Sequence, residues 1–332
     1  MEAVYINKFS EYFNQEDLKY IVAVLHLEER EFDSFGERIR GNIARALNCD
    51  PSEPDDFSLL PDAVTNINLG FSMKGEKYAY RCPGFGTELY IDRKSETFGN
   101  TVAHRLNIDP SFLYIDEDEG WKISKFIHFT RKLDYHNIND VEKALEILRT
   151  LHNSGEKAPR DFMVWDETVK IYEDIREFGM QRYSDFESLY EKMSNLVDLT
   201  KKDGAPLILC HVDCWKPNFL VTETEDGNSR MDLIDWEFSG NCDAGMDIGT
   251  FICCSDYTYD EGIDVIKRYY HGNPSKTELR HMLAYTAIAS YYWYILTVFY
   301  LARRGVKDEE NEKLWYDNSI LYSDGALIYY QD

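Results

Sequence analysis

The stretch LCHVDCWKPNFLVTETEDGNSRMDLIDWEFSG, residues 209–240, contains two short apolar runs separated by a turn rich in Glu, Asp, Gly and Asn. Asp213 and Asn218 precede the first apolar run, and Asp235 stands at the far end of the second. Two such runs around a polar turn predict a β-hairpin. The loop that leads into its first strand then lies beside the end of its second strand, so we expect the three polar side chains to lie close together.

This set of side chains is typical of phosphoryl transfer from ATP, which needs metal ions on the phosphates and a carboxylate that orients the attacking hydroxyl. The spacing His211-x-Asp213-x4-Asn218 is that of a kinase catalytic loop, and Asp235 stands where the magnesium-binding aspartate of the next strand belongs. The loop pattern alone is weak, because an Asp and an Asn also cap turns. The IDWE ending of the second run, residues 234–237, strengthens the prediction.

The composition limits the classes of partner. The chain has 332 residues, enough for one large two-lobed fold or two modest domains. It carries 60 Asp and Glu against 36 Lys and Arg, a formal net charge of -24, which argues against a nucleic acid or an anionic membrane as the main partner. A cationic small molecule would be attracted instead, although acidity that only keeps the protein soluble is the alternative explanation.

The cysteines and the first residues indicate the compartment. Seven cysteines without a CxxC pair are typical of buried thiols in a reducing environment. Cys210, His211 and Cys214 do not predict a zinc site, because adjacent residues on a strand point to opposite faces. The N-terminal sequence MEAVYINKFSEYF has no basic leader followed by an apolar segment, so we expect a cytoplasmic protein.

One uncharged segment, residues 282–302, is long enough to cross a bilayer. It contains five tyrosines spread along its length, unlike an aromatic belt that is confined to the membrane interfaces. We therefore expect a buried helix and no membrane span.

The order of the expected elements predicts an α+β fold with two lobes. Helical periodicity over 15–47 is followed by expected strands at 57–60, 66–73 and 78–83, a helix over 88–106, and a hairpin of residues 111–115 and 121–127. Beyond Phe129 the pattern is mostly helical apart from the opening hairpin. We expect a helical extension at 1–32, a small antiparallel sheet lobe at 33–128 that binds nucleotide, and a larger helical lobe at 129–332 with the catalytic loop and substrate pocket.

Two groups of motifs carry a resemblance to known enzymes. The run HVDCWKPNFLV, then MDLIDWEFSG and DIGTF, resembles the aminoglycoside phosphotransferase and choline kinase superfamily. The segment TNINLGFSM, then YAYRCPGFGTELYIDRKSE, is similar to the choline kinase signature of T-N, R-x-P-G-x-G-T and I-D-R-x-x-E, with bacterial choline kinases of the LicA type as the nearest match. The resemblance covers about Phe57 to the C-terminus. It implies a protein-kinase-like fold that uses ATP and Mg²⁺ to phosphorylate the hydroxyl of choline.

The same resemblance implies roles for individual residues. Asp213 would be the catalytic base, and Asn218 and Asp235 would be magnesium ligands. Arg81 would bind phosphate with Glu96 as its ion-pair partner, although a surface salt bridge is the plainer explanation of that pair. The residues implied at the ATP site are Thr65, Asn66, Arg81, Glu96, Lys125, Phe126 and Ile127. Those implied as structural support are His211, Asp92, Arg93 and Asp247.

The substrate pocket matches the family less fully. Its implied residues are Glu237, Tyr257, Tyr292, Trp293, Trp315 and Tyr316. Leu296 replaces a second tryptophan, Cys254 stands where some relatives have a pocket glutamate, and Pro61, Asp62 and Ala63 replace glycines near the phosphates. The alternatives are therefore a kinase for ethanolamine, an aminoglycoside or another hydroxyl compound, and an inactive kinase-like protein that binds nucleotide or choline. The oligomeric state is open.

Overall fold

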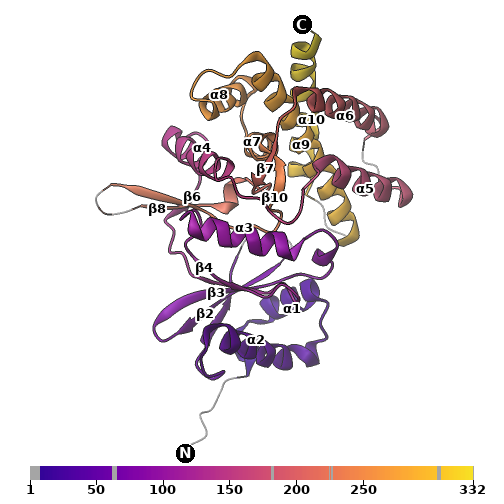
Figure 1. Cartoon of the computed structure of the whole chain (residues 1–332). Coiled ribbons are helices and arrows are strands. Elements are labelled where there is room, and N and C mark those ends of the chain that lie inside the picture. Colours follow the sequence, from indigo (N-terminus) through magenta and orange to yellow (C-terminus); the bar gives the residue numbers. More distant parts are fainter. Residues whose placement is uncertain are drawn as a thin grey trace, which may run out of the picture. The chain divides into compact units, whose positions relative to one another are not determined.

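The computed structural model describes residues 8–61, 66–180, 183–223, 225, 227–304 and 308–331. The chain divides into two compact units, Met1–His128 and Phe129–Asp332. Figure 1 shows strands together with helices in the first unit and mostly helices in the second. An antiparallel sheet followed by helices is the predicted α+β class.

The first unit is built on a five-stranded sheet in the order β1-β2-β3-β5-β4, and every pair is antiparallel. Its strands are β1 (Asp55–Leu59), β2 (Ile67–Met73), β3 (Glu76–Cys82), β4 (Phe112–Ile115) and β5 (Lys122–Lys125).

Helix α3 (Arg93–Arg105) lies between β3 and β4 in the chain. The expected helix over 88–106 was wrong at its start, because a short 3-10 helix, Thr87–Leu89, comes first. Helix α3 begins only after Asp92, whose side chain accepts a hydrogen bond from the Ser95 N–H at 2.8 Å. A side-chain cap of this kind satisfies one of the free N–H groups at a helix start.

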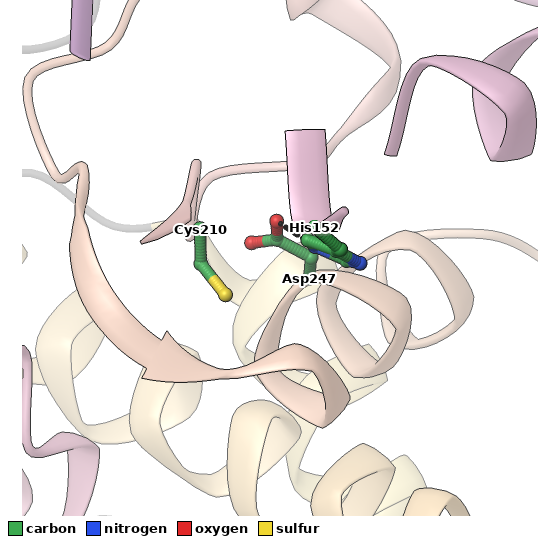
Figure 2. A group of neighbouring side chains, drawn as sticks. All are labelled: His152, Cys210 and Asp247. Carbon is green, nitrogen blue, oxygen red and sulfur yellow. Dashed lines mark hydrogen bonds and ion pairs between the residues drawn. The ribbon is translucent and has the colours of Figure 1, made fainter. Parts of the chain in front are cut away.

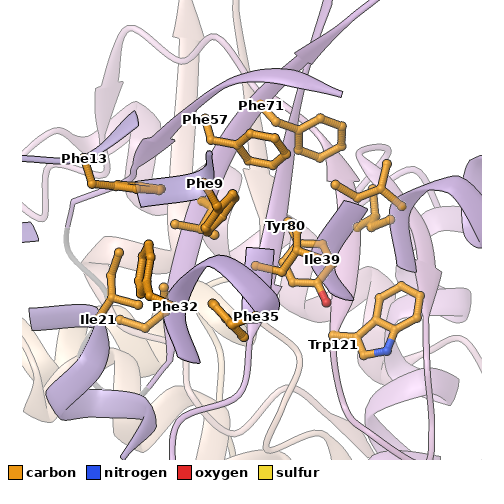
Figure 3. Close-up of a cluster of buried hydrophobic side chains, with 14 of the residues drawn as sticks. Phe9, Phe13, Ile21, Phe32, Phe35, Ile39, Phe57, Phe71, Tyr80 and Trp121 are labelled. Carbon is orange, nitrogen blue, oxygen red and sulfur yellow. The ribbon is translucent and has the colours of Figure 1, made fainter. Parts of the chain in front are cut away.

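Two further helices, α1 (Gln15–Leu25) and α2 (Phe32–Leu47), share an aromatic core with this sheet (Figure 3). Phe9 packs against Phe57 of β1 with ring centroids 5.0 Å apart and against Phe35 of α2 at 6.2 Å. Residues of the expected N-terminal extension, 1–32, thus contribute to the same core as the strands of the expected nucleotide lobe.

The second unit contains seven helices among its described residues and two small sheets. The helices are α4 (Ile138–His152), α5 (Val164–Glu177), α6 (Phe186–Thr200), α7 (Ala244–Cys253), α8 (Tyr259–Tyr269), α9 (Lys276–Arg304) and α10 (Glu309–Gln331). One sheet has the order β6-β8-β9, from β6 (Arg131–Lys132), β8 (Phe219–Glu223) and β9 (Ser229–Leu233). The other pairs β7 (Leu207–Cys210) with β10 (Gly240–Asp243). The predicted hairpin is β8 and β9.

Helix α9 is the core helix of this unit and packs against α5, α6, α7 and α10. The span Lys276–Phe299 is long and apolar enough to cross a membrane by length and composition, but 89% of its most apolar window is buried inside the protein. Gly249 of α7 meets it closely, because a Cβ at this glycine would lie 2.7 Å from the Tyr285 carbonyl oxygen. The segment expected to be a buried helix is therefore buried by its neighbours.

Candidate functional site

The loop between β7 and β8 holds Asp213 and Asn218 against each other. It ends in a 3-10 turn, Lys216–Asn218, that leads directly into β8. The Asn218 Nδ2 donates to the Asp213 carboxylate oxygen Oδ2 and to the Asp213 carbonyl, each at 2.9 Å. In this orientation the side-chain N–H groups of Asn218 are bonded to Asp213. The amide oxygen Oδ1 of Asn218 is then the atom suited to bind a metal ion.

Strand pairing brings Asp235 to the same place. Phe219 of β8 pairs with Leu233 of β9, so the residues just before β8 lie beside those just after β9. The Ile234 N–H donates to the Asn218 carbonyl at 3.0 Å. The His211 ring nitrogen Nε2 lies 3.0 Å from the Ile234 carbonyl oxygen. Two hydrogen bonds thus tie the loop to the residue that precedes Asp235.

The Asp213 carboxylate lies in conditions that favour its protonated form. Burial raises its pKa well above the ordinary aspartate value, and the nearby negative charges of Asp235 and Glu237 raise it further. The hydrogen bond from Asn218 acts in the opposite direction but does not outweigh them. Three carboxylates gathered with an amide oxygen are hard oxygen donors of the kind that Mg²⁺ prefers, and a cation there would offset their repulsion.

Two residues of this cluster have left-handed backbone conformations. Val212 has φ 76° and Asp235 has φ 69°. A β-branched residue at positive φ is an outlier that costs about 1–3 kcal/mol and persists only where the surroundings enforce it. Val212 directly precedes the proposed base, Asp213, and Asp235 is itself a proposed metal ligand. The surrounding packing must therefore hold both residues in the left-handed conformation.

Asp247, in the first turn of α7, supplies part of that constraint. Its Oδ1 accepts from the Val212 N–H at 2.6 Å and its Oδ2 from the His211 N–H at 3.0 Å. Burial acts to raise the pKa of Asp247, but the hydrogen bond and charge of His152 together with His211 outweigh it, so the pKa is lowered. An ionised carboxylate therefore holds the backbone of the loop at His211 and Val212.

The side chains of His152, Cys210 and Asp247 form a cluster whose ligand atoms lie within 4.8 Å of one another (Figure 2). Hydrogen bonds already occupy these atoms. The His152 Nε2 lies 2.9 Å from Asp247 Oδ2 and its Nδ1 lies 2.7 Å from the Tyr269 hydroxyl. The Cys210 thiol donates to the Asp243 carbonyl at 3.5 Å. The cluster is thus a hydrogen-bonded junction between α4, β7 and α7, and it explains how Asp247 is held.

A second cluster lies in the first unit. Arg81 of β3 and Glu96 of α3 form an ion pair with side chains 5% and 0% exposed, so it is not a surface salt bridge. Glu96 also accepts from Arg93 at 2.8 Å. Breaking such a buried pair costs about 3–5 kcal/mol, because it leaves an uncompensated charge. The pair predicted from the sequence is formed, and its role in phosphate binding stays a prediction.

The other residues predicted at the ATP site are placed as follows. Thr65 lies outside the described residues. Asn66 is buried, and its side-chain oxygen accepts from the Gly84 N–H at 3.4 Å.

At the end of β5 and just after it, two backbone N–H groups are already hydrogen-bonded within the first unit. The Lys125 N–H donates to the Ser111 carbonyl at 2.8 Å and the Phe126 N–H to the Lys77 carbonyl at 3.0 Å. Hydrogen bonds from this segment to an adenine ring would therefore be made by its carbonyl oxygens and by the backbone of Ile127.

Three of the predicted pocket residues lie near Asp213 or near one another. Glu237 is buried and its charge acts on Asp213. Trp293 packs edge-on against Phe238 at 5.7 Å between ring centroids and lies 6.4 Å from the Trp315 ring. The Trp293 indole N–H donates to the Thr250 hydroxyl at 2.9 Å, which orients the ring.

The three predicted pocket tyrosines have different surroundings. The Tyr257 hydroxyl donates to the Tyr135 carbonyl at 2.6 Å, and Tyr135 in turn accepts from the Lys216 N–H of the catalytic loop at 3.0 Å. Tyr292 packs on Phe162 and Trp293.

The Tyr316 hydroxyl donates to Asp185 at 2.7 Å, and its ring stacks on Tyr183 at 3.9 Å. The structure thus ties Tyr257 to the loop and places Tyr316 with residues of another part of the unit.

Sequence reasoning missed two residues that hold the loop, His152 and Tyr135. Each lies on a segment far from the loop in the chain, and no motif marks either of them. Their contacts with Asp247 and with the Lys216 N–H depend on packing between segments.

Comparisons with known proteins agree with this geometry. Residues 57–294 match the choline/ethanolamine kinase family. The protein LicA of Haemophilus influenzae is 27% identical over 194 residues, which cover 57% of this chain and 55% of that protein. The match thus spans about half the length of that relative.

Solved structures show the same fold. Choline kinase LicA from Streptococcus pneumoniae has a TM-score of 0.71 and 22% identity, with 88% of this chain and 99% of that chain covered. A LicA structure in complex with AMP has a TM-score of 0.68 at 22% identity, covering 88% of this chain and 98% of that chain. The predicted kinase-like fold is thereby confirmed.

Proposed function

Because the chain belongs to the choline/ethanolamine kinase family, we propose that it transfers the γ-phosphoryl group of ATP to the hydroxyl of choline. The observation that carries the proposal is the cluster of Asp213, Asn218 and Asp235. Asn218 donates to Asp213 at 2.9 Å, and Ile234, the residue before Asp235, is tied to the same loop by two contacts of 3.0 Å. Phosphoryl transfer relies mostly on positioning and charge stabilisation, which such a rigid cluster supports.

Each residue of the cluster has one task in the proposed reaction. Asp213 accepts a hydrogen bond from the choline hydroxyl and takes its proton as the oxygen attacks the γ-phosphorus. The O–H bond breaks, the new O–P bond forms, and the bond to the β-phosphate oxygen breaks to release ADP. Asn218 orients the Asp213 carboxylate through its Nδ2. Asp235 and the Asn218 Oδ1 would hold Mg²⁺, and the ion would neutralise charge on the phosphate oxygens.

The nucleotide is assigned to the first unit. The family resemblance gives Arg81 the position of a phosphate-binding strand residue. Its ion pair with Glu96 and its hydrogen bond to the Gly120 carbonyl at 3.3 Å support that role, because they fix the position of the guanidinium. The LicA complex with AMP supports nucleotide use by the fold.

The acceptor cation is assigned to Glu237 and the faces of Trp293 and Trp315. A quaternary ammonium is held by aromatic faces at about 0.5–2 kcal/mol per contact, and a buried carboxylate adds charge attraction.

The seven cysteines are all free thiols, which supports the cytoplasmic location as part of the same proposal.

A coupled assay of ADP release tests the proposal across choline, ethanolamine, an aminoglycoside and an uncharged analogue of choline with carbon in place of nitrogen. Choline is expected to have the highest kcat/KM, with release dependent on Mg²⁺ and lost in Asp213→Asn. A higher kcat/KM for ethanolamine or the aminoglycoside would reassign the acceptor. ATP binding in calorimetry without ADP release from any acceptor would favour the non-catalytic alternative.

A further inference from the structure

An exposed aromatic residue at the tip of the loop 83–92 is docked on the end of helix α1. The Phe85 ring, 60% exposed, stacks on the His26 ring with centroids 4.2 Å apart and an interplanar angle of 12°. The Phe85 N–H donates to the Val24 carbonyl at 3.2 Å. The loop that joins β3 to α3 is thus attached to a helix from the first part of the chain by one ring stack and one backbone hydrogen bond.

The same loop is tied on its other side to the Arg81–Glu96 pair. The Thr87 hydroxyl donates to the Gly84 carbonyl at 2.9 Å and accepts from Arg93 at 3.0 Å. Arg93 also donates to Glu96 at 2.8 Å, and Glu96 pairs with Arg81. An unbroken series of contacts therefore runs from the loop to the guanidinium assigned to phosphate.

Ending helix α1 in the left-handed conformation does not require the imidazole ring of His26. His26 ends α1 in the left-handed region at φ 53°. Glycine and asparagine satisfy this position with less or no steric cost, whereas the histidine supplies a ring that those residues lack. The ring lies flat on Phe85, and a stack of this kind contributes beyond the area that it buries.

We propose that helix α1 is a positioning element of the nucleotide site. His26 and Phe85 hold the loop 83–92, and Thr87 and Arg93 pass this constraint to Glu96 and Arg81. This inference rests on the proposed function, because it takes the phosphates of a nucleotide as the ligand of Arg81. It assigns a task to residues 8–26, which lie outside the matched family region of 57–294.

The experiment compares ATP·Mg²⁺ binding by calorimetry and steady-state kinetics in wild type, His26→Asn and Phe85→Ala. His26→Asn retains a residue suited to the left-handed position and removes only the ring. Each variant is expected to weaken ATP binding and raise the KM for ATP about two- to tenfold, the scale of one aromatic pair. The kcat and the acceptor KM should stay near wild type.

Three further variants make the result specific. Phe85→Tyr retains the ring and should restore wild-type ATP affinity. Phe178→Ala removes another exposed aromatic side chain, 62% exposed and in the second unit, and should have no effect. The double variant His26→Asn with Phe85→Ala should lose no more ATP affinity than the single variant with the larger loss, because all three variants remove the same ring contact.

The outcomes separate this inference from the proposed function. Absence of ATP binding in wild type would remove the proposed function. Binding in wild type with unchanged affinity in both single variants, or additive losses in the double variant, would overturn the inference alone. Melting curves without nucleotide check that every variant is folded at the assay temperature, and a shared loss of ATP affinity in Phe178→Ala would also count against the inference.

Discussion

At the scale of single residues, Asp213 lies in an environment that disfavours its charge, whereas the role proposed for it as a base needs that charge. Burial and the charges of Asp235 and Glu237 raise its pKa well above the ordinary range. Because its folded-state pKa lies above its unfolded value of about 3.9, the charge destabilises the folded protein as pH rises through the folded-state pKa. Keeping an aspartate at this position therefore costs stability, as is expected of a residue retained for the proposed function.

Asp213→Asn is therefore expected to have two opposite effects. The kcat should fall by about two or more powers of ten, because a positioned base is lost. The melting temperature at neutral pH, without Mg²⁺ and nucleotide, should rise, because an asparagine does not ionise and so does not carry the cost of a raised pKa. Steady-state ADP release and thermal denaturation measure the two effects. Near-normal turnover would contradict the role of Asp213, and a lower melting temperature would contradict the electrostatic account.

Trp293 is the aromatic residue whose replacement best tests cation recognition. Trp293→Ala should raise the choline KM about tenfold or more and leave the ATP KM unchanged, since one desolvated cation–π contact contributes up to ~2 kcal/mol. Trp293→Phe, the matched variant, retains an aromatic face and loses the hydrogen bond to Thr250, so its choline KM should change less.

Folding of both Trp293 variants must be checked by melting curves, because the side chain is 8% exposed and its removal leaves a cavity. An unchanged choline KM in folded Trp293→Ala would remove this residue from the acceptor site.

At the scale of elements, a buried histidine joins the start of α9 to two other segments. The His281 ring lies between Asp243, which caps α7, and Asp203, which follows α6, at 2.9 and 3.2 Å. Arg280 and the Tyr330 hydroxyl of α10 also bind Asp203. Burial lowers the pKa of His281, but the two carboxylates outweigh it, so the pKa is raised.

The stabilisation from His281 should therefore depend on pH. It is complete below the unfolded histidine pKa of about 6.5 and is lost as pH rises through the raised folded-state pKa. Urea denaturation of wild type and His281→Gln should show a difference in free energy of unfolding that is larger at about pH 6 than at about pH 9. A difference that is the same at both values, or grows with pH, would contradict the paired-cation account of His281.

At the scale of the whole molecule, charge is the property that acts over the longest range. The net charge of -24 attracts a cationic acceptor and repels ATP. Salt shortens the range of both effects, since the Debye length falls from about 30 Å at 0.01 M to about 8 Å at 0.15 M ionic strength.

Raising ionic strength over this range should therefore raise the KM for choline and lower the KM for ATP. Steady-state kinetics at the two ionic strengths measure both constants, and the uncharged choline analogue is the control whose KM should stay constant. Shifts of both constants in the same direction would show that local contacts, and not the net charge, govern the salt effect.

The proximity of the three residues proposed as catalytic could be predicted because they are close in the chain. Asp213, Asn218 and Asp235 lie within one hairpin and the loop before it, and the pairing of Phe219 with Leu233 brings them together. Helical periodicity likewise predicted that the second unit is mostly helical, since a repeating apolar face is a local property, but it did not identify α7.

The contacts that hold the site could not be predicted in this way. Packing of segments 95 residues apart in the chain joins His152 to Asp247, and packing of α1 on the loop 83–92 joins His26 to Phe85. The start of α3 was also missed, because the loop before it is shaped by contacts with Arg93 and Val24. Local sequence patterns specify which residues form a strand, a helix or a turn. Which distant side chains then meet depends on how those elements pack, and this packing holds the loop before β8 in its left-handed conformation at Val212.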